Sequence, residues 1–138
     1  MADALSLQVS YSGKPLEGTL AEADTALSRA LELDPDLGEA WASSARIAHQ
    51  RGESDRAESM FRKAIELNSN YATAHQWLSW LLLGTGRSDE ALGYAEEALR
   101  LDPLSAMANA NLGDVLEAAG RFAEAGSYYR RAIAIDSA

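Results

Sequence analysis

The stretch from Ala72 to Pro103 reads ATAHQWLSWLLLGTGRSDEALGYAEEALRLDP and contains two helical patterns joined by a tight turn. Apolar residues recur there at intervals of three and four, which is the period of an amphipathic helix. They are Leu78, Leu81, Leu82, Ala91, Leu92, Ala95, Ala98 and Leu99. Gly84 and Gly86 end the first helix, and Ser88 is suited to cap the second. Pro103 ends the unit, because proline cannot continue a helix.

The same unit recurs along the chain with a period of 34 residues. Alanines mark the second helix of each copy, and a glycine marks the turn before it. The matching residues are Ala57, Ala91 and Ala125, then Ala64, Ala98 and Ala132, and in the turn Gly52, Gly86 and Gly120. The helix ends read AIELN, ALRLD and AIAID, and ALELD at Ala30–Asp34 lies one period earlier. A helix–turn–helix unit of this length is typical of a helical solenoid.

At these residues the chain resembles the tetratricopeptide repeat family. The two small alanines of the second helix, the turn glycine and the prolines Pro35 and Pro103 match the family pattern. The resemblance extends from about Thr19 to the C-terminus and implies an all-α, right-handed solenoid of antiparallel helix pairs. We expect a partial repeat at residues 19–37 and full repeats at 38–71, 72–105 and 106–138.

The repeats depart from the family pattern at two places. The large aromatic residue expected early in the first helix is present as Trp41, but His75 and then Asn109 replace it. The proline expected at the end of a unit becomes Ser69 after the second repeat and Ser137 after the last. These departures leave the packing around His75 and Asn109 open.

Polar residues before the apolar patterns predict where the helices begin. Thr19 with Glu22, and Asp36 with Glu39, have the spacing of a capping box, in which two residues satisfy each other's free backbone N–H groups. Ser105 is suited to cap the first helix of the last repeat. The first helix of the array is therefore predicted to begin at Thr19.

Residues 1–18 do not follow the repeat, and we expect an irregular N-terminal segment there. Leu5–Tyr11 alternates apolar with polar residues, which is typical of a strand, and Gly13–Pro15 follows as a turn signal. The segment is a degenerate first helix, the tail of a preceding domain, or a strand that pairs with another chain through its open edge. The sequence leaves these alternatives open.

The charge balance excludes several classes of partner. The chain has 21 acidic residues against 12 Lys and Arg, a net charge of −9, and no basic run. Neither a nucleic acid nor an anionic membrane is therefore an expected partner. The longest apolar run, Trp80–Leu83, is far shorter than the ~20 residues that span a bilayer. The absence of cysteine excludes disulfides but does not fix the compartment, for which we favour the cytoplasm.

The resemblance implies that the first helices line a concave groove that binds a partner protein or peptide. The predicted groove residues are Arg46, His49, Gln76, Trp77, Trp80, Met107, Asn111 and Asp114. Trp77 and Trp80 lie one helical turn apart and share a face, so they are candidate anchors for a partner. The alternative is that both pack on the neighbouring repeat, because aromatic residues in either role look alike in sequence.

The charges along the groove suggest how a partner would be recognised. Arg46 and His49 lie at one end, and Asp114 and Glu117 at the other, so we expect a partner with charges of both signs around an apolar anchor. Some family members hold a terminal carboxylate with Lys, Asn and Arg on successive helices. That mode is not expected, because only Arg46 and Asn111 offer suitable chemistry at the matching positions.

The sequence contains no constellation typical of catalysis or of metal binding. His49 and His75 are the only histidines, and neither has a second histidine at helical spacing or a cluster of carboxylates. Gly84–Gly86 is not followed by the Lys-Ser/Thr pair of a phosphate loop. We therefore predict a protein that is not an enzyme and that carries no cofactor or metal.

A second hypothesis assigns the chain an assembly role. Leu20–Leu31 and Phe122–Ile133 would present apolar stripes at the two ends of the array, where terminal repeats normally need a polar face. These ends could join two copies into a homodimer. The chain could also be an oligomerisation or regulatory segment of a larger bacterial signalling or transcription-regulatory protein that uses these ends. The run ALRLDPLSA loosely resembles such segments.

Overall fold

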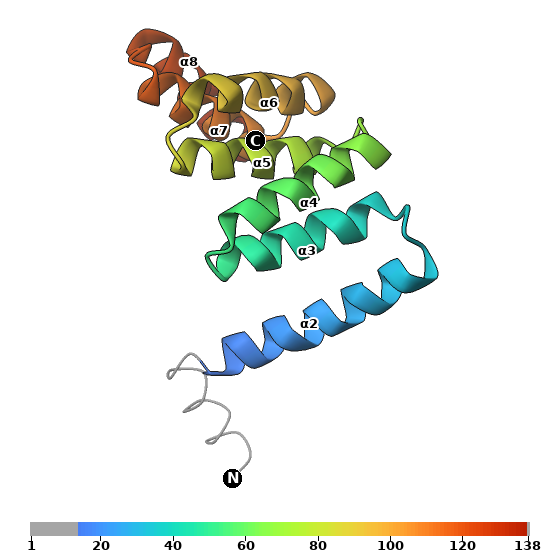
Figure 1. Cartoon of the computed structure of the whole chain (residues 1–138). Helices are drawn as coiled ribbons and strands as arrows, with labels where there is room; N and C mark the ends of the chain where they lie inside the picture. Colours follow the sequence, from blue (N-terminus) through green and yellow to red (C-terminus); the bar gives the residue numbers. More distant parts are fainter. Residues whose placement is uncertain (1–13, 138) are drawn as a thin grey trace.

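The computed structural model describes residues 14–137, which form seven helices and no strand. The first is α2 (Lys14–Leu33), and three helix pairs follow it. They are α3 (Gly38–Gln50) with α4 (Ser54–Leu67), α5 (Ala72–Gly84) with α6 (Ser88–Leu101), and α7 (Ala106–Ala118) with α8 (Phe122–Ser137). The pairs stack in chain order from α2 to α8 (Figure 1). The predicted all-α solenoid of antiparallel helix pairs is confirmed.

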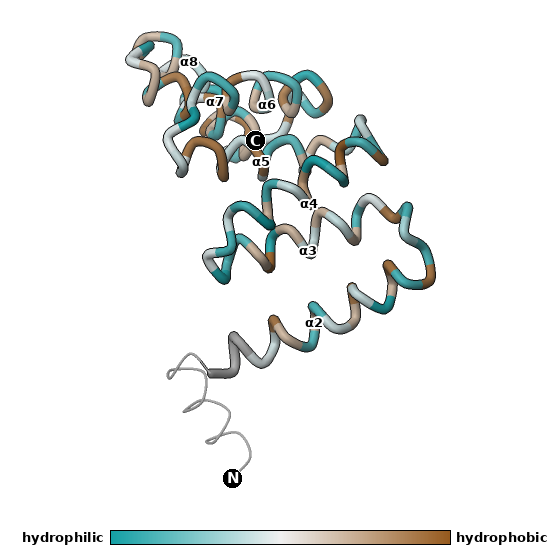
Figure 2. Tube along the Cα trace, viewed as in Figure 1, coloured by the Kyte–Doolittle hydropathy of each residue, from teal (hydrophilic) through white to brown (hydrophobic). Residues whose placement is uncertain are grey.

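The first helices of the pairs form one layer of this stack. α5 contacts α3 on one side and α7 on the other, while α4 and α6 each pack between their own partner and the first helix of the next pair. Hydrophilic and hydrophobic residues alternate along the helices (Figure 2), as expected of helices that bury one face. The layer of α3, α5 and α7 is the surface on which the candidate site lies.

The three repeat turns share one backbone conformation. Gly52, Gly86 and Gly120 have φ angles of 81°, 79° and 79°. Residues with a Cβ atom rarely adopt this left-handed conformation, whereas glycine does so at little cost. This requirement explains why glycine returns every 34 residues in the turn.

The alanines that mark the second helices are all buried. Small side chains there let neighbouring helices approach, and Ala64 packs with Ala42 of α3 and Ala74 of α5. Among the larger core residues, Phe61, Leu78, Leu82 and Val115 are fully buried. The marker alanines and the periodic leucines Leu78, Leu81 and Leu82 thus lie in the core.

The starts of α2 and α3 differ from the prediction. α2 begins at Lys14 rather than at Thr19, with Pro15 in its first turn, where the missing N–H of proline is tolerated. The end of the segment predicted to be irregular is therefore helical, while Leu5–Tyr11 lies outside the described residues. For α3 the residue before the helix is Leu37, which makes no side-chain cap. The capping box predicted at Asp36 was wrong.

The later helix starts give one correction and one confirmation. Arg87 precedes α6 and makes no side-chain cap, so Ser88 is the first helical residue and not the cap. Ser105 precedes α7, and its Oγ accepts a hydrogen bond from the N–H of Ala108 at 3.1 Å. The predicted cap at Ser105 is confirmed.

Trp41, His75 and Asn109 occupy the same place in successive repeats and make the same hydrogen bond. In each case a side-chain nitrogen meets the carbonyl oxygen six residues earlier, at 2.8 Å for Trp41, 2.9 Å for His75 and 3.3 Å for Asn109. Since a carbonyl only accepts, His75 must carry its hydrogen on Nε2. The departures from the family pattern thus keep an N–H donor that ties the start of each repeat to the end of the previous one.

Replacing Asn109 by leucine is expected to lower the free energy of unfolding by ~1–2 kcal/mol, because the side chain also donates to the carbonyl of Ser105 at 2.8 Å. Urea denaturation of both proteins measures this difference. Asn109→His keeps an N–H donor and is the matched control, with a smaller expected loss. Equal stability of Asn109→Leu and the wild type would show that these bonds do not hold the repeats together.

Gly113 allows the ring of Tyr129 to lie directly on α7. A Cβ atom at position 113 would stand 2.8 Å from Cε1 of Tyr129, which is closer than such atoms normally approach. The Tyr129 hydroxyl lies 2.6 Å from Oδ1 of Asp114 and 3.0 Å from Oε2 of Glu117. Burial, followed by these two carboxylates, raises the pKa of Tyr129 above its ordinary value. The ring and the two acids fix α8 on α7.

Gly113→Ala is expected to destabilise the fold by ~1–3 kcal/mol, because the added methyl group must displace the Tyr129 ring. Gly93→Ala is the matched control. No atom lies within 4 Å of a Cβ at Gly93, which is in a helix interior, so alanine should stabilise there by ~0.5–1 kcal/mol. Thermal unfolding of both variants tests the opposite signs. A Gly113→Ala protein as stable as the wild type would contradict the close contact.

Four charged side chains join α4 to α6. Glu58 accepts hydrogen bonds from Arg87 at 2.6 Å and from Arg62 at 2.9 Å and 3.0 Å. Glu90 pairs with the same two arginines at 2.8 Å and 3.2 Å. The hydrogen bond from Arg87, followed by the bonds and charge of Arg62, outweighs burial and lowers the pKa of Glu58 below its ordinary value of 4.5.

This network predicts a pH-dependent contribution to stability. A carboxyl group whose pKa is lower in the folded state stabilises the fold above its ordinary pKa and loses that effect as the pH falls through the lowered value. Glu58→Gln should therefore cost ~0.5–1 kcal/mol near neutral pH, and the difference from the wild type should shrink as the pH is lowered below 4.5. Urea denaturation at neutral and at acidic pH measures this. A difference that persists unchanged in acid would contradict the ionic origin.

Candidate partner-binding groove

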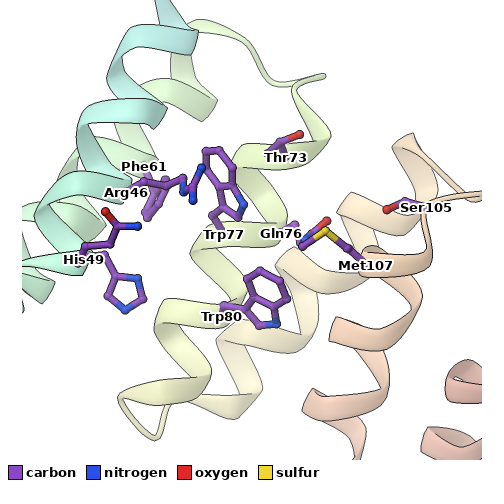
Figure 3. A pocket seen from close by; sticks show the side chains of 10 residues that line it. Arg46, His49, Phe61, Thr73, Gln76, Trp77, Trp80, Ser105 and Met107 are labelled. Atoms are coloured by element: carbon purple, nitrogen blue, oxygen red, sulfur yellow. The ribbon is translucent and has the colours of Figure 1, made fainter. Parts of the chain in front are cut away.

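A cavity of about 510 Å³ lies among the first helices of the three repeats. α3 and α5 supply most of its walls, and α7 begins at its far side (Figure 3). The lining residues are Arg46, His49, Gln50, Phe61, Thr73, Gln76, Trp77, Trp80, Ser105 and Met107. Its volume falls within the range of sites that hold ligands in other proteins.

Six of the eight predicted groove residues line this cavity. They are Arg46, His49, Gln76, Trp77, Trp80 and Met107. Figure 3 shows Arg46 and His49 on one side and Met107 on the other, with the two tryptophans between them. Gln50, Phe61 and Ser105 also line the cavity. Phe61 also belongs to the hydrophobic core, and Ser105 also caps α7, as predicted.

Trp77 packs on the core and also lines the cavity. Its ring lies 6.2 Å from the ring of buried Phe61, with the planes tilted by 58°. The guanidinium of Arg46 lies over it, 4.5 Å from the ring centroid. Trp77 is half-buried and packs against both hydrophobic clusters of the described residues. Trp77 therefore packs on the core, as the alternative from sequence expects, and lines the cavity as well.

Trp80 lies one turn further along α5 in a different environment. It is half-buried and lines the cavity, but it is not among the described residues that pack on either hydrophobic cluster. Met107, on the opposite wall, is 54% exposed. Their apolar surface is available to a bound molecule without rearrangement of the core.

Gln76 places an amide between these apolar side chains. The residue is 7% exposed and lines the cavity. Within residues 14–137 its side chain forms no hydrogen bond to the protein. A glutamine amide carries both donors and acceptors. It is therefore a free polar group that a peptide main chain can satisfy.

The prediction that Asn111 faces the groove was wrong. Its side chain is fully buried, because α7 packs against α5 as well as against α8. The amide nitrogen and oxygen of Asn111 have no protein hydrogen-bond partner in the described part of the chain. The residue cannot contact a partner from this position.

Asp114 is exposed but lies outside the cavity. Its carboxylate accepts the hydrogen bond from Tyr129, and Glu117 lies beside the same hydroxyl. The acidic end predicted for the groove is therefore occupied with holding α8. No aspartate or glutamate belongs to the cavity lining.

Between residues 14 and 137, no three His, Asp or Glu side chains come close enough to hold a metal ion. Over the same range, no helix combines the length and the apolar character that crossing a bilayer requires. The cavity on the first helices is the larger of the two described cavities, and we take it as the candidate site.

The stacked helix pairs and their cavity define a class of protein, the helical-repeat solenoid with a binding surface along its first helices. A family model described as "Tetratricopeptide repeat" matches residues 17–72 and 78–138, and a second one of the same description matches residues 48–106. The chain therefore belongs to the tetratricopeptide repeat family. This membership supports a general role as a protein-interaction scaffold.

Solved structures share the fold. The "Crystal structure of MamA" superposes with a TM-score of 0.76 at 24% identity, over 97% of this chain and 75% of that one. The structure titled "MamA MSR-1 C2" gives a TM-score of 0.71 at 23% identity, over 88% of this chain and 70% of that one. At these identities the likeness concerns the fold alone. Comparison with curated protein sequences gives no match.

Proposed function

We propose that this chain is a scaffold that binds a segment of a partner protein in the cavity between α3, α5 and α7, with Trp80 as the apolar anchor. The observation that carries the proposal is the composition of the cavity. Trp80 and Met107 present apolar surface beside Gln76, whose amide has no protein partner among the described residues. Aromatic residues in such settings supply much of the binding energy at interfaces.

A peptide segment fits this cavity better than a small metabolite does. The lining runs across three helices and combines the large apolar rings with the uncharged polar side chains Thr73, Gln76 and Ser105. These groups can pair with the regularly spaced N–H and C=O groups of an extended main chain. The proposal assigns no chemical step to the chain, in keeping with a binding protein rather than an enzyme.

Affinity capture from the lysate of the source organism tests the proposal. Wild type, Trp80→Ala and Phe122→Ala would be immobilised after circular dichroism has shown equal helix content. Phe122 is 69% exposed on α8 and serves as the control for loss of a large apolar side chain outside the cavity. A partner held by wild type and Phe122→Ala but lost by Trp80→Ala supports the groove. The same proteins held by all three variants would contradict it.

The assembly role remains as a second candidate because of the surface of α8. Ile133 is 66% exposed, whereas its counterparts Ile65 and Leu99 in the preceding repeats pack on the hydrophobic core. Together with Phe122 it forms an apolar surface where a further helix, or a second copy, could pack. Sedimentation velocity of the wild type and of Phe122→Ser/Ile133→Ser tests this role. A dimer that the double variant loses supports it, and a monomer in both contradicts it.

A further inference from the structure

We infer that the partner segment carries an acidic side chain next to a bulky apolar one, and that Arg46 binds the acidic group. This inference rests on the proposed function, because it specifies the chemistry of the ligand in the same cavity. The sequence predicts a partner with charges of both signs, and this inference replaces that prediction with an acidic partner segment. The inference is based on the contacts of Arg46 and on the charges around the cavity.

The cavity is a cationic site on an acidic protein. The whole chain has a net charge of −9, yet the lining contains Arg46, one histidine and no carboxylate. The two acids predicted for the far end, Asp114 and Glu117, instead hold the Tyr129 hydroxyl. A basic group on a ligand would find no opposite charge in the lining, whereas an acidic group would find Arg46.

Arg46 is held in place without being neutralised. Its guanidinium lies over the Trp77 ring, 4.5 Å from the centroid, and the residue is exposed. No ion pair to Arg46 forms within the described residues. By contrast, Arg62, Arg87 and Arg121 are each paired with glutamate. Stacking leaves the N–H edge of a guanidinium free for two parallel hydrogen bonds to a carboxylate.

The apolar neighbour follows from the side chains beyond Arg46. α3 supplies the guanidinium, α5 supplies Trp80, and α7 supplies Met107 (Figure 3). A ligand whose carboxylate meets Arg46 therefore continues over aromatic and thioether surface. Gln76 lies beyond Trp77, beside Met107 (Figure 3), and can bind the main chain of such a ligand. The ligand is thus a peptide with Asp or Glu close to a large apolar residue.

Selection from a phage-displayed library of random short peptides tests this ligand class. The full chain would be used as wild type, Arg46→Glu, Arg131→Glu and Trp80→Ala. Arg131 is the matched control, because its guanidinium also lies over an aromatic ring, that of Tyr128 at 5.0 Å, but on α8 and outside the cavity lining. Wild type and Arg131→Glu should enrich Asp or Glu beside a bulky apolar residue. Arg46→Glu should enrich Lys or Arg in the same place.

A synthetic peptide from the wild-type selection adds a quantitative measurement. Replacing its acidic residue by the matching amide should weaken binding to wild type roughly tenfold or more, and should change binding to Arg46→Glu much less. Peptides that need Trp80 but show no acidic preference would overturn the inference and leave the proposed function intact. If no selected peptide needs Trp80, the groove itself is contradicted, and the inference falls with it.

Discussion

Phe61→Ala is expected to lower the free energy of unfolding by ~3–5 kcal/mol, because it empties a fully buried position in the core. Phe61 is fully buried on α4, packs in the main hydrophobic cluster, and touches Trp77 of the next repeat. A solenoid is held together by contacts between neighbouring repeats, since it has no single central core. Truncating this side chain therefore opens a cavity where two repeats meet.

The other phenylalanine of the chain provides the control for this change. Phe122 is 69% exposed, so Phe122→Ala should alter the free energy of unfolding by no more than ~0.5 kcal/mol. Urea denaturation followed by circular dichroism measures both variants. If the two variants lost equal stability, the packing of α4 on α5 would not be the contact that holds the array together.

Trp80→Ala is expected to weaken partner binding by ~2 kcal/mol or more, which is about 30-fold, while changing the fold little. The indole lines the cavity but packs on neither hydrophobic cluster of the described residues. Its loss therefore removes contact area from the ligand rather than from the core. Isothermal titration with a captured partner or a selected peptide measures the change in affinity, and thermal unfolding measures the stability of the same sample.

Two further tryptophan variants separate binding from folding. Trp77→Ala should lower both affinity and stability, because that ring packs on Phe61 and supports Arg46. Trp41→Ala should lower stability alone, because its ring lies outside the cavity lining and donates to a backbone carbonyl. An affinity that survives Trp80→Ala but falls with Trp41→Ala would contradict the assignment of the anchor.

The fold was predictable because every repeat has the same two physical requirements, one in its turn and one in its second helix. The glycine turn needs a positive φ, and the alanines of the second helices need to be small, so both requirements appear in the sequence at a fixed period. The common role of Trp41, His75 and Asn109 was harder to predict. The three side chains differ in size and polarity and share only an N–H donor. Their common role is recognised only when the structure shows the carbonyl oxygen that accepts the bond.

The candidate site was predictable only in part, because groove positions in a repeat do not reveal what covers them. The equivalent position carries Trp77 in one repeat and Asn111 in the next. The first lines the cavity, and the second is buried by the contact of α7 with α5. Asp114 likewise has groove spacing, but it is used by Tyr129, a contact 15 residues away along the chain. Such assignments depend on tertiary packing rather than on period.

Photo-crosslinking tests most directly whether the cavity on the first helices holds the partner. A benzophenone amino acid would be placed at Met107, which is 54% exposed on the cavity wall, or at Phe122, which is exposed on α8. Illumination of the complex with the captured partner should then join the partner to position 107 and not to position 122. Crosslinks from position 122 alone would contradict the groove and would place the partner at the end of the array.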